Sequence, residues 1–319
     1  MTERDRPQPH AAQRTHGGQR LPSILPTLAA VCALLSASVV AAADDNLNPP
    51  AASDGGASQN AVAKYFSEWF ERSDRAKESQ PHWMTPVVTV TPRLEQEYRY
   101  DQVWQNRPKS VSFQSYGFNK GLELIPTEQT EIILGVPGYQ KEMSPTEDKQ
   151  GFADASFLLK YRFLSANEEN GNYIVTGFLG VSVPTGSDEF TTGHTIYTPT
   201  IAAGKGWGTR ERGFDIQSTL SISLPDGNEK LIGVPIVWNT ALQAHIFDKL
   251  WPEIEANYTH YKEGPNAGKS QTLITTGLIL GRYELIDRVR FVIGAGYQQA
   301  VSSFRTVNNG WIVTARAPF

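Results

Sequence analysis

The sequence predicts an all-β protein: a single antiparallel, up-and-down transmembrane β-barrel of about twelve strands, preceded by a signal peptide and a short amphipathic helix. Two observations predict the barrel. From about Pro86 onwards, successive segments alternate apolar and polar side chains, the period of a strand with one apolar face. The connections between these segments alternate between short and longer polar stretches, as the two rims of an up-and-down barrel do.

Twelve segments carry this alternation, with lengths that cluster near the ~10 residues that a tilted strand needs to cross a bilayer. In one of them, Phe214, Ile216 and Leu220 alternate with Asp215 and Gln217. The twelve are Leu94–Asp101, Ser110–Phe118, Leu122–Leu134, Phe152–Leu164, Tyr173–Val183, Ile196–Lys205, Phe214–Leu224, Ile236–Phe247, Pro252–Tyr261, Ser270–Glu284, Arg288–Ala300 and Gly310–Phe319.

A water-soluble sandwich also alternates, so the connections decide between the two folds. Short ones are expected at Asn119–Gly121, Asp248–Trp251 and Leu285–Asp287. Longer polar ones, at the other rim, are expected at Gly135–Gly151, Pro184–Thr195, Pro225–Pro235, Lys262–Lys269 and Val301–Asn309. A sandwich with Greek-key crossings has no reason to show this regularity, and a barrel is therefore the expected fold.

Aromatic residues near the strand ends suggest two girdles at the membrane interfaces. Trp104, Trp238 and Trp311 are expected at one end of the barrel, and Trp207, Trp251 and Phe319 at the other. The alternative is that tryptophan often lies near strand ends in any β protein.

Three regions are expected along the chain. Residues 1–43 form a signal peptide, because basic residues precede the apolar run Leu21–Ala43 and an Ala-x-Ala site predicts cleavage after Ala43; an uncleaved anchor is the alternative. The only cysteine, Cys32, lies in this run, which excludes disulfides in the mature chain.

Residues 44–85 form a periplasmic linker that contains a short amphipathic helix over Asn60–Lys77, and residues 86–319 form the barrel. The helix could lie on the membrane surface, plug the barrel or remain loosely attached in the periplasm.

Charged residues on the expected inner face gather in the periplasmic third of the barrel. An ion inside a narrow barrel needs a partner or water, so these residues are expected to pair or to line water. We expect either a mixed-charge ring that constricts a pore or a seat for the N-terminal segment; a solvated rim is the alternative. The residues are Glu95, Glu97, Lys160, Arg162, Glu253, Glu255, Arg282, Arg290 and Arg316.

Farther along the barrel axis the inner face is expected to be apolar, either as a passage for an apolar solute or as side chains packed into a plug. The residues expected to point inward there are Ile274, Thr276, Leu278, Leu280, Val292 and Ile312.

Motifs for covalent chemistry are not found. The stretch Gly204–Gly208 lacks the spacing of a phosphate-binding loop, and no histidine after residue 43 has a partner at metal-ligand spacing. The net charge of −4 gives no reason to expect nucleic acid as a partner. We expect no catalytic residue, metal or cofactor; a hydrolase would need Ser, His and an orienting Asn or Asp to meet across strands.

Several segments resemble a bacterial family of outer-membrane transporters tied to the meta-pathway of phenol degradation. They are Phe152–Phe163, Gly180–Gly186, the run from Thr198 to Gly208, Ser221–Pro225 and the C-terminal strands. The resemblance implies an outer-membrane barrel of a Gram-negative bacterium that passes small hydrophobic or aromatic molecules without covalent chemistry.

The expected partners are outer-membrane lipid, small hydrophobic solutes and the barrel-assembly machinery, the last through the C-terminal Phe319. Two other functions stay open: a structural or adhesive barrel without transport, and a membrane-embedded lipid hydrolase.

Overall fold

The computed structural model describes residues 62–117 and 120–319, all within one compact unit, Asn60–Phe319. The expected signal peptide, residues 1–43, lies outside the described residues. A helix, α3 (Trp69–Glu78), precedes the sheet, and residues 62–67 before it are also helical. None of the described helices has the length and apolar character needed to cross a membrane.

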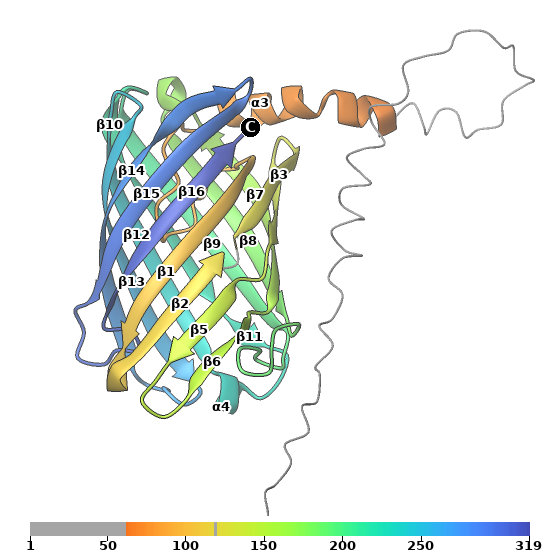
Figure 1. Ribbon diagram of the computed structural model, residues 1–319. Helices are drawn as coiled ribbons and strands as arrows, with labels where there is room; N and C mark the ends of the chain where they lie inside the picture. Colours follow the sequence, from red (N-terminus) through yellow and green to blue (C-terminus); the bar gives the residue numbers. More distant parts are fainter. Residues whose placement is uncertain (1–61, 118–119) are drawn as a thin grey trace, which may run out of the picture. The chain divides into compact units, whose positions relative to one another are not determined.

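Sixteen strand segments form one antiparallel sheet (Figure 1). Their bounds are β1 (Glu97–Arg107), β2 (Val111–Gly117), β3 (Gly121–Thr127), β4 (Thr130–Gly135), β5 (Tyr139–Met143), β6 (Asp148–Phe152), β7 (Ala155–Ala166), β8 (Tyr173–Val183), β9 (Ile196–Gly208), β10 (Arg212–Ile222), β11 (Leu224–Pro225), β12 (Val234–Ile246), β13 (Leu250–Glu263), β14 (Ser270–Ile286), β15 (Val289–Ala300) and β16 (Asn309–Pro318). Three short helices lie in the connections: η1 (Pro108–Ser110), η2 (Glu168–Asn170) and α4 (Glu229–Ile232).

These segments make twelve barrel strands, which confirms the predicted number. β2 and β3 lie end to end against β1, β4 and β5 form the next strand, β6 and β7 the one after, and β11 continues β10 along β9. Every other segment is a whole strand. β16 then pairs with β1 from Glu97↔Pro318 to Asn106↔Asn309, so the sheet closes and leaves no edge strand.

Two predicted connections are wrong, although the count is right. Asn119–Gly121 was predicted as a reversal, but β2 and β3 both run antiparallel to β1 and so run in the same direction. The reversal comes where Thr127 pairs with Thr130. The expected long loop Gly135–Gly151 is mostly strand, because β5 and β6 extend the wall and pair as far as Met143↔Asp148. Short apolar runs on both sides of an interruption look like separate strands in a sequence, since pairing partners are not visible there.

The two faces of the wall differ as the alternation predicts. Along β10, Phe214 and Leu220 are exposed on the outside, whereas Asp215 and Gln217 are buried on the inside. Trp104 and Trp311 are paired and exposed on the outside, and Trp238 and Trp207 are also exposed. Trp251 contradicts the predicted girdle: it is 1% exposed and packs in the lumen beside His245, with ring centroids 4.8 Å apart.

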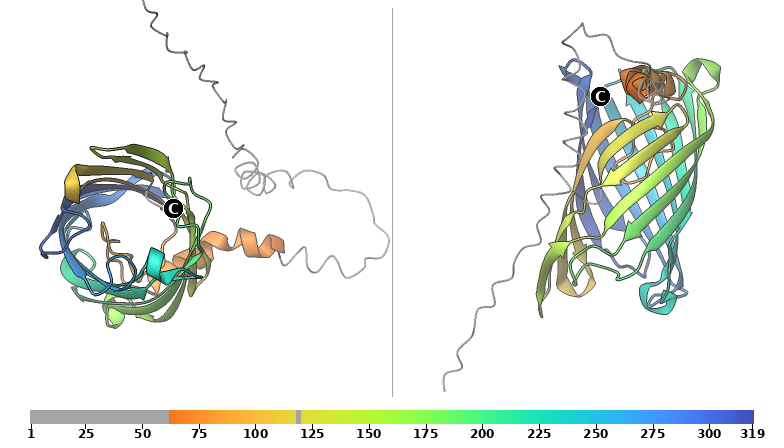
Figure 2. Two further views of the ribbon diagram at one scale, coloured as in Figure 1. Left: turned by 90° about the horizontal axis from the view of Figure 1, so that it is seen from below. Right: turned by 90° about the vertical axis from the view of Figure 1, so that its right-hand side faces the viewer.

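Residues 79–96, here called the inner segment, lie inside the barrel without joining the sheet (Figure 2). Pro81, Pro86 and Pro92 have no N–H to give to a ladder, which opposes strand pairing here. The segment is a loop that returns to the end of the barrel where it began. The side-chain amide of Gln80 closes the loop, donating to the Leu94 carbonyl (2.8 Å) and accepting from the Leu94 N–H (2.9 Å).

The main apolar core is the contact between this loop and the wall. Trp83, Met84 and Val87 of the inner segment pack against wall residues from strands around the barrel. These wall residues are Val103, Ile174, Trp251, Ile279, Val292 and Ile312. The predicted boundary between linker and barrel, residue 86, therefore falls within the loop, and the sheet itself begins at Glu97.

Candidate functional site: the occupied lumen

Two carboxylates of β13 hold the inner segment by its backbone N–H groups. Glu253 Oε1 accepts from Val87 N at 3.0 Å. Glu255 accepts from Val88 N at 2.8 Å and from Thr89 N at 2.6 Å, one with each carboxylate oxygen. Consecutive N–H groups of a non-helical, non-sheet loop would otherwise be unsatisfied in the lumen, so these charge-assisted bonds replace a ladder.

Cationic side chains of the wall hold the carbonyl groups of the same loop. Arg316 donates to the Thr85 carbonyl at 2.5 Å and to the Pro86 carbonyl at 2.8 Å. Arg99 donates to the Val87 carbonyl at 2.8 Å, and its guanidinium also pairs with Asp101 at 2.8 Å. The loop is thus held from both sides by side chains of opposite charge.

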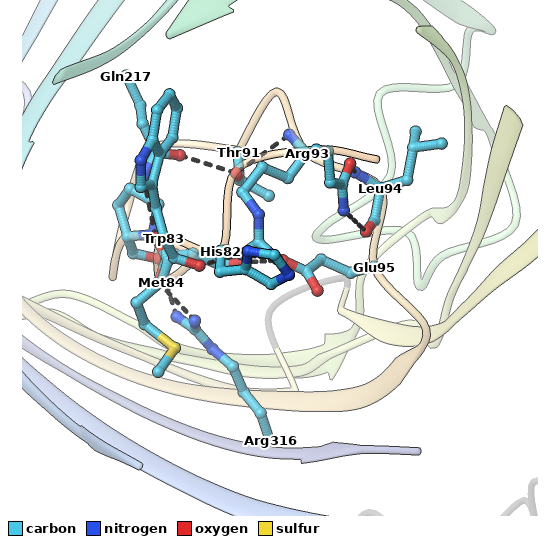
Figure 3. A network of polar contacts seen from close by, with 12 residues as sticks. His82, Trp83, Met84, Thr91, Arg93, Leu94, Glu95, Gln217 and Arg316 are labelled. Atoms are coloured by element: carbon cyan, nitrogen blue, oxygen red, sulfur yellow. Dashed lines mark hydrogen bonds and ion pairs between the residues drawn. The ribbon is translucent and has the colours of Figure 1, made fainter. Parts of the chain in front are cut away.

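One neutral side chain joins the two arms of the loop. Gln217 of β10 donates to the Met84 carbonyl at 2.9 Å on the descending arm. Its carbonyl oxygen accepts the hydroxyl of Thr91 at 2.7 Å on the returning arm (Figure 3). Arg93, also drawn there, donates to the Trp83 carbonyl and pairs with Glu95 at 2.8 Å.

The indole of Trp83 lies against two glycines of β9. A Cβ atom at Gly204 or at Gly206 would overlap this indole, so both positions must lack a side chain while Trp83 is in place. This explains why the stretch Gly204–Gly208 has glycine at positions 204 and 206. The signal was present in the sequence, since Gly204 and Gly206 share one face of a strand, but their partner is a residue more than a hundred positions earlier.

The returning arm is held near the base of the loop by a buried pair. Lys160 of β7 lies 2.9 Å from Glu131 of β4 and also donates to the Arg93 carbonyl at 3.1 Å. Glu131 in turn accepts from Glu95 N at 2.6 Å. Both charged groups therefore also hydrogen bond to the backbone of the inner segment, and these bonds offset the cost of burying two charges.

Two contacts fasten the entrance of the loop. Arg162 donates to the Ala76 carbonyl of α3 at 2.8 Å. In the turn after β7, Glu168 accepts His82 N at 2.7 Å and lies 2.8 Å from His82 Nδ1. Burial opposes ionisation of Glu168, but the hydrogen bonds from the side chain and backbone of His82 lower its pKa to about 2.

Of the nine charged residues predicted to face the lumen, seven are buried and most contact the inner segment. Glu95 belongs to the inner segment itself rather than to a strand, and Glu97 lies opposite Glu123 in the β1–β3 register. Arg282 is partly buried, and Arg290 is exposed beside a cavity of about 360 Å³ at the α3 end. Their role in lining a pore stays a prediction.

Arg282 faces inward for a reason that the alternation cannot supply. The β14–β15 register shifts between Gly281 and Tyr283, and Arg282 has a φ of 59°. This bulge turns its guanidinium into the lumen, where it donates to the carbonyls of His82 (2.7 Å) and Trp83 (2.9 Å).

In a strand without a bulge, an inward Arg282 would place every second residue before it on the inner face as well. The bulge reverses these faces. Ile274, Thr276, Leu278 and Leu280 were expected to point inward, but the buried residues are their neighbours Leu273, Thr275 and Ile279, so this prediction is wrong. Val292 and Ile312 do lie inside, packed against the inner segment.

Sequence reasoning also missed Arg99, Asp101, Glu131 and Gln217. Arg99 and Asp101 could have been found, because they follow Glu97 at period two in the same strand.

The described residues bring together no group of three or more potential metal ligands. One histidine does meet a serine, which sequence reasoning did not expect: His260 Nδ1 lies 2.9 Å from Ser270 Oγ, and Tyr258 also donates to that oxygen. Within residues 62–117 and 120–319, no carboxylate or amide hydrogen bonds to the other ring nitrogen of His260, so the orienting member of a catalytic triad is missing.

No family model matches the sequence, and no curated protein matches it either. Among solved structures, an outer membrane channel from Pseudomonas putida F1 is 12% identical with a TM-score of 0.47, over 70% of this chain and 94% of that one. NanC porin is 11% identical with a TM-score of 0.39, over 69% and 98%.

The transport unit of the autotransporter AIDA-I from Escherichia coli is 10% identical with a TM-score of 0.40, over 78% and 97% of the two chains. Because these identities are so low and the TM-scores are below 0.5, no substrate or activity is carried over from them.

Proposed function

We propose that this chain is an outer-membrane channel of a Gram-negative bacterium, closed by its inner segment, that passes small molecules without covalent chemistry. The observation that carries the proposal is that the lumen is occupied by a loop outside the sheet rather than by the side chains of the wall alone. The loop makes no strand pairing, and most of its hydrogen bonds to the wall run between a wall side chain and the loop backbone. Each of these bonds can be exchanged for one to water.

The character of the inner wall supports passage rather than a solid core. Behind the loop, the wall presents buried charged and amide side chains, whereas an all-apolar lining would serve a purely structural barrel at least as well. Such a lining can be hydrated when the loop moves, as the interiors of membrane barrels are. The exposed apolar outside of the same strands fits the hydrocarbon core of a membrane.

Hydrophobic or aromatic solutes are the finer part of the proposal, as is membership of the transporter family of the phenol meta-pathway. Besides the resemblance in sequence, one feature supports an apolar solute. When the loop leaves, the wall partners of Trp83 and Val87, including Trp251, Ile279 and Val292, become an apolar strip in an otherwise polar lumen.

The proposal is tested by recording current from the purified protein in planar bilayers, with Glu253→Gln and Glu255→Gln combined. The amide cannot accept both the Val88 and Thr89 N–H groups, so the bound loop should be weakened. A hydrogen bond to a charged group contributes ~1.5–3 kcal/mol, and ~1.4 kcal/mol is tenfold in a population. We expect the open probability to rise by about tenfold or more.

Glu284→Gln is the control for the loss of a carboxylate, because Glu284 is exposed and has no hydrogen bond to the loop among the described residues. Uptake of an aromatic hydrocarbon into cells should rise with the double variant but not with the control. Silence of all three proteins in the bilayer, with the barrel folded, would contradict transport and favour the structural barrel. Labelling of Ser270 by a serine-directed probe would instead favour the hydrolase.

A further inference from the structure

The helical stretch of residues 62–78 has one apolar face along its whole length, but only part of that face is covered. Near its C-terminal end, Ser73 and Ala76 are fully buried, and Ala76 packs on Leu94 and Ile125 at the base of the inner segment. Here the apolar face points toward the barrel. The spacing of three and four residues that joins Ser73 and Ala76 continues N-terminally through Trp69, Phe66 and Val62.

The N-terminal part of the same face is exposed. Val62, Phe66 and Phe70 are 54%, 62% and 45% exposed, unusually high values for three neighbouring apolar side chains. The opposite face of the helix is charged: Lys64 lies 3.8 Å from Glu68, and Arg75 pairs with Glu128. The exposed apolar residues are therefore one side of an amphipathic helix rather than scattered surface positions.

The helix crosses the rim of the barrel and continues beyond the wall (Figures 1 and 2). Two bonds fix the crossing: the Tyr65 hydroxyl donates to the Pro126 carbonyl at 2.9 Å, and Trp69 Nε1 donates to Gln96 Oε1 at 2.8 Å. Next to this point, Tyr161 and Phe163 are exposed on the outside of β7, whose partner strand β4 begins at the same rim.

The direction of the apolar face follows from the buried half. Ala76 packs on Leu94 of the inner segment and on Ile125 of β3, so the buried half of the face is turned toward the barrel. Phe66 lies on the same face, in the part of the helix that continues beyond the wall (Figure 2), and is therefore turned the same way. Under the proposed function, the region beyond the wall is where the periplasmic leaflet meets the barrel, so the uncovered face is continuous with the lipid-facing surface of the wall.

We infer that residues 62–70 are an interfacial membrane anchor whose aromatic face is buried in the phospholipid of the periplasmic leaflet. This inference rests on the proposed function for the orientation of the barrel. The anchor holds the entrance of the inner segment at the mouth, so that the loop can be displaced within the lumen without being drawn through the barrel. An amphipathic helix with aromatic residues on one face and charges on the other is suited to the interface.

The test uses single cysteines carrying a nitroxide label, in a Cys32→Ser background and in phospholipid nanodiscs. Phe66→Cys probes the apolar face, and Lys64→Cys is the matched control two residues away on the charged face. Ile201→Cys, on the outside of β9, reports lipid, and Leu231→Cys, in α4, reports water. All four side chains are exposed, so the labels should leave the fold intact, which heat-modifiable migration on a gel checks.

We expect the label at position 66 to collide several-fold more with oxygen than with a water-soluble nickel chelate, relative to position 64, and to resemble position 201. A label at 66 that resembles 231, while 201 reports lipid, would overturn the anchor and leave the channel proposal standing. A label at 66 inaccessible to both reagents would show a protein contact and also overturn it. If position 201 itself reports water, the membrane barrel fails and the anchor with it.

Discussion

The two faces of the barrel wall come from the same strands, yet they obey different rules. On the outside of β10, Phe214 and Leu220 are exposed and make no specific hydrogen bond, so any apolar side chain of similar size would serve. On the inside, Gln217 has particular partners on both arms of the inner segment. The outside should therefore accept any apolar substitution of similar size, whereas the inside should accept only side chains that keep these hydrogen bonds.

The outer face can be challenged by a charge at mid-height. Ile201→Lys places an ammonium where the side chain is 49% exposed, near the middle of β9. A lysine on the lipid face near the bilayer midplane costs ~2–4 kcal/mol. We expect the free energy of unfolding in lipid vesicles, measured by denaturant titration, to fall by about that amount.

Leu231→Lys is the matched control for this variant, because Leu231 is 73% exposed in α4, outside the sheet. Its unfolding free energy should stay within ~0.5 kcal/mol of the unchanged protein. Equal losses in the two variants would mean that the outside of the wall does not face lipid.

The inner face can be challenged by one small side chain. Gly206→Val introduces atoms where Trp83 lies, and a strand backbone cannot yield far enough to relieve the overlap. Overpacking of this kind costs ~1–3 kcal/mol. It should weaken the binding of the loop to the wall rather than the sheet, because the sheet is far more constrained. We expect the open probability in planar bilayers to rise by about tenfold or more.

Ala203→Val tests the same change on the other face, since Ala203 is exposed on the outside of β9. Its channel record should match that of the unchanged protein. Identical behaviour of Gly206→Val and Ala203→Val would show that Trp83 does not depend on the glycines for its position.

The smallest expected effect concerns the rim, where the inner segment meets solvent. Hydrogen bonds from His82 lower the pKa of Glu168 from its ordinary value of 4.5 to about 2. The contact therefore stabilises the bound loop fully above about pH 4.5 and loses this contribution as the pH falls towards 2. Near solvent the contribution is screened, and ~1 kcal/mol is a reasonable size.

Current recorded from pH 6 down to pH 2 should show an acid-induced rise in open probability. In Glu168→Gln, whose amide does not titrate in this range, that rise should be smaller and the openings at pH 6 more frequent. The comparison separates the contribution of Glu168 from that of Glu78, which lies 3.7 Å from His82 Nε2. If the unchanged protein and Glu168→Gln had the same pH profile, the acid-induced opening would come from a group other than Glu168.

The sequence predicted the outer face better than the inner one. Alternation marked most of the wall and the number of strands, because successive residues of every strand face an apolar outside and a polar inside in turn. It failed along β14, where the bulge at Arg282 reverses the faces of the residues before it. The girdle prediction failed at Trp251, because Trp251 shares the inward face of Glu253 and Glu255 in β13. Alternation also split one strand in two at Asn119–Gly121, because an interruption and a turn look alike without the neighbouring strands.

The charged residues of the candidate site were partly foreseeable and their partners were not. Glu253 and Glu255 could be placed inside by parity, and a seat for the N-terminal segment was one of two expected roles. That these carboxylates receive Val87, Val88 and Thr89 could not be read, because backbone N–H groups leave no mark in a sequence.

By itself, the sequence determined a twelve-stranded wall with an apolar outside, a charged inside and an amphipathic helix before it, since each of these is a periodic pattern along the chain. Only the tertiary structure decided that residues 79–96 fill the lumen, that Trp83 lies on Gly204 and Gly206, and that the helix leaves half of its apolar face uncovered. The reason is physical: the loop has no period of its own, and its position is set by side chains that barrel closure brings together from β1, β10, β13 and β16.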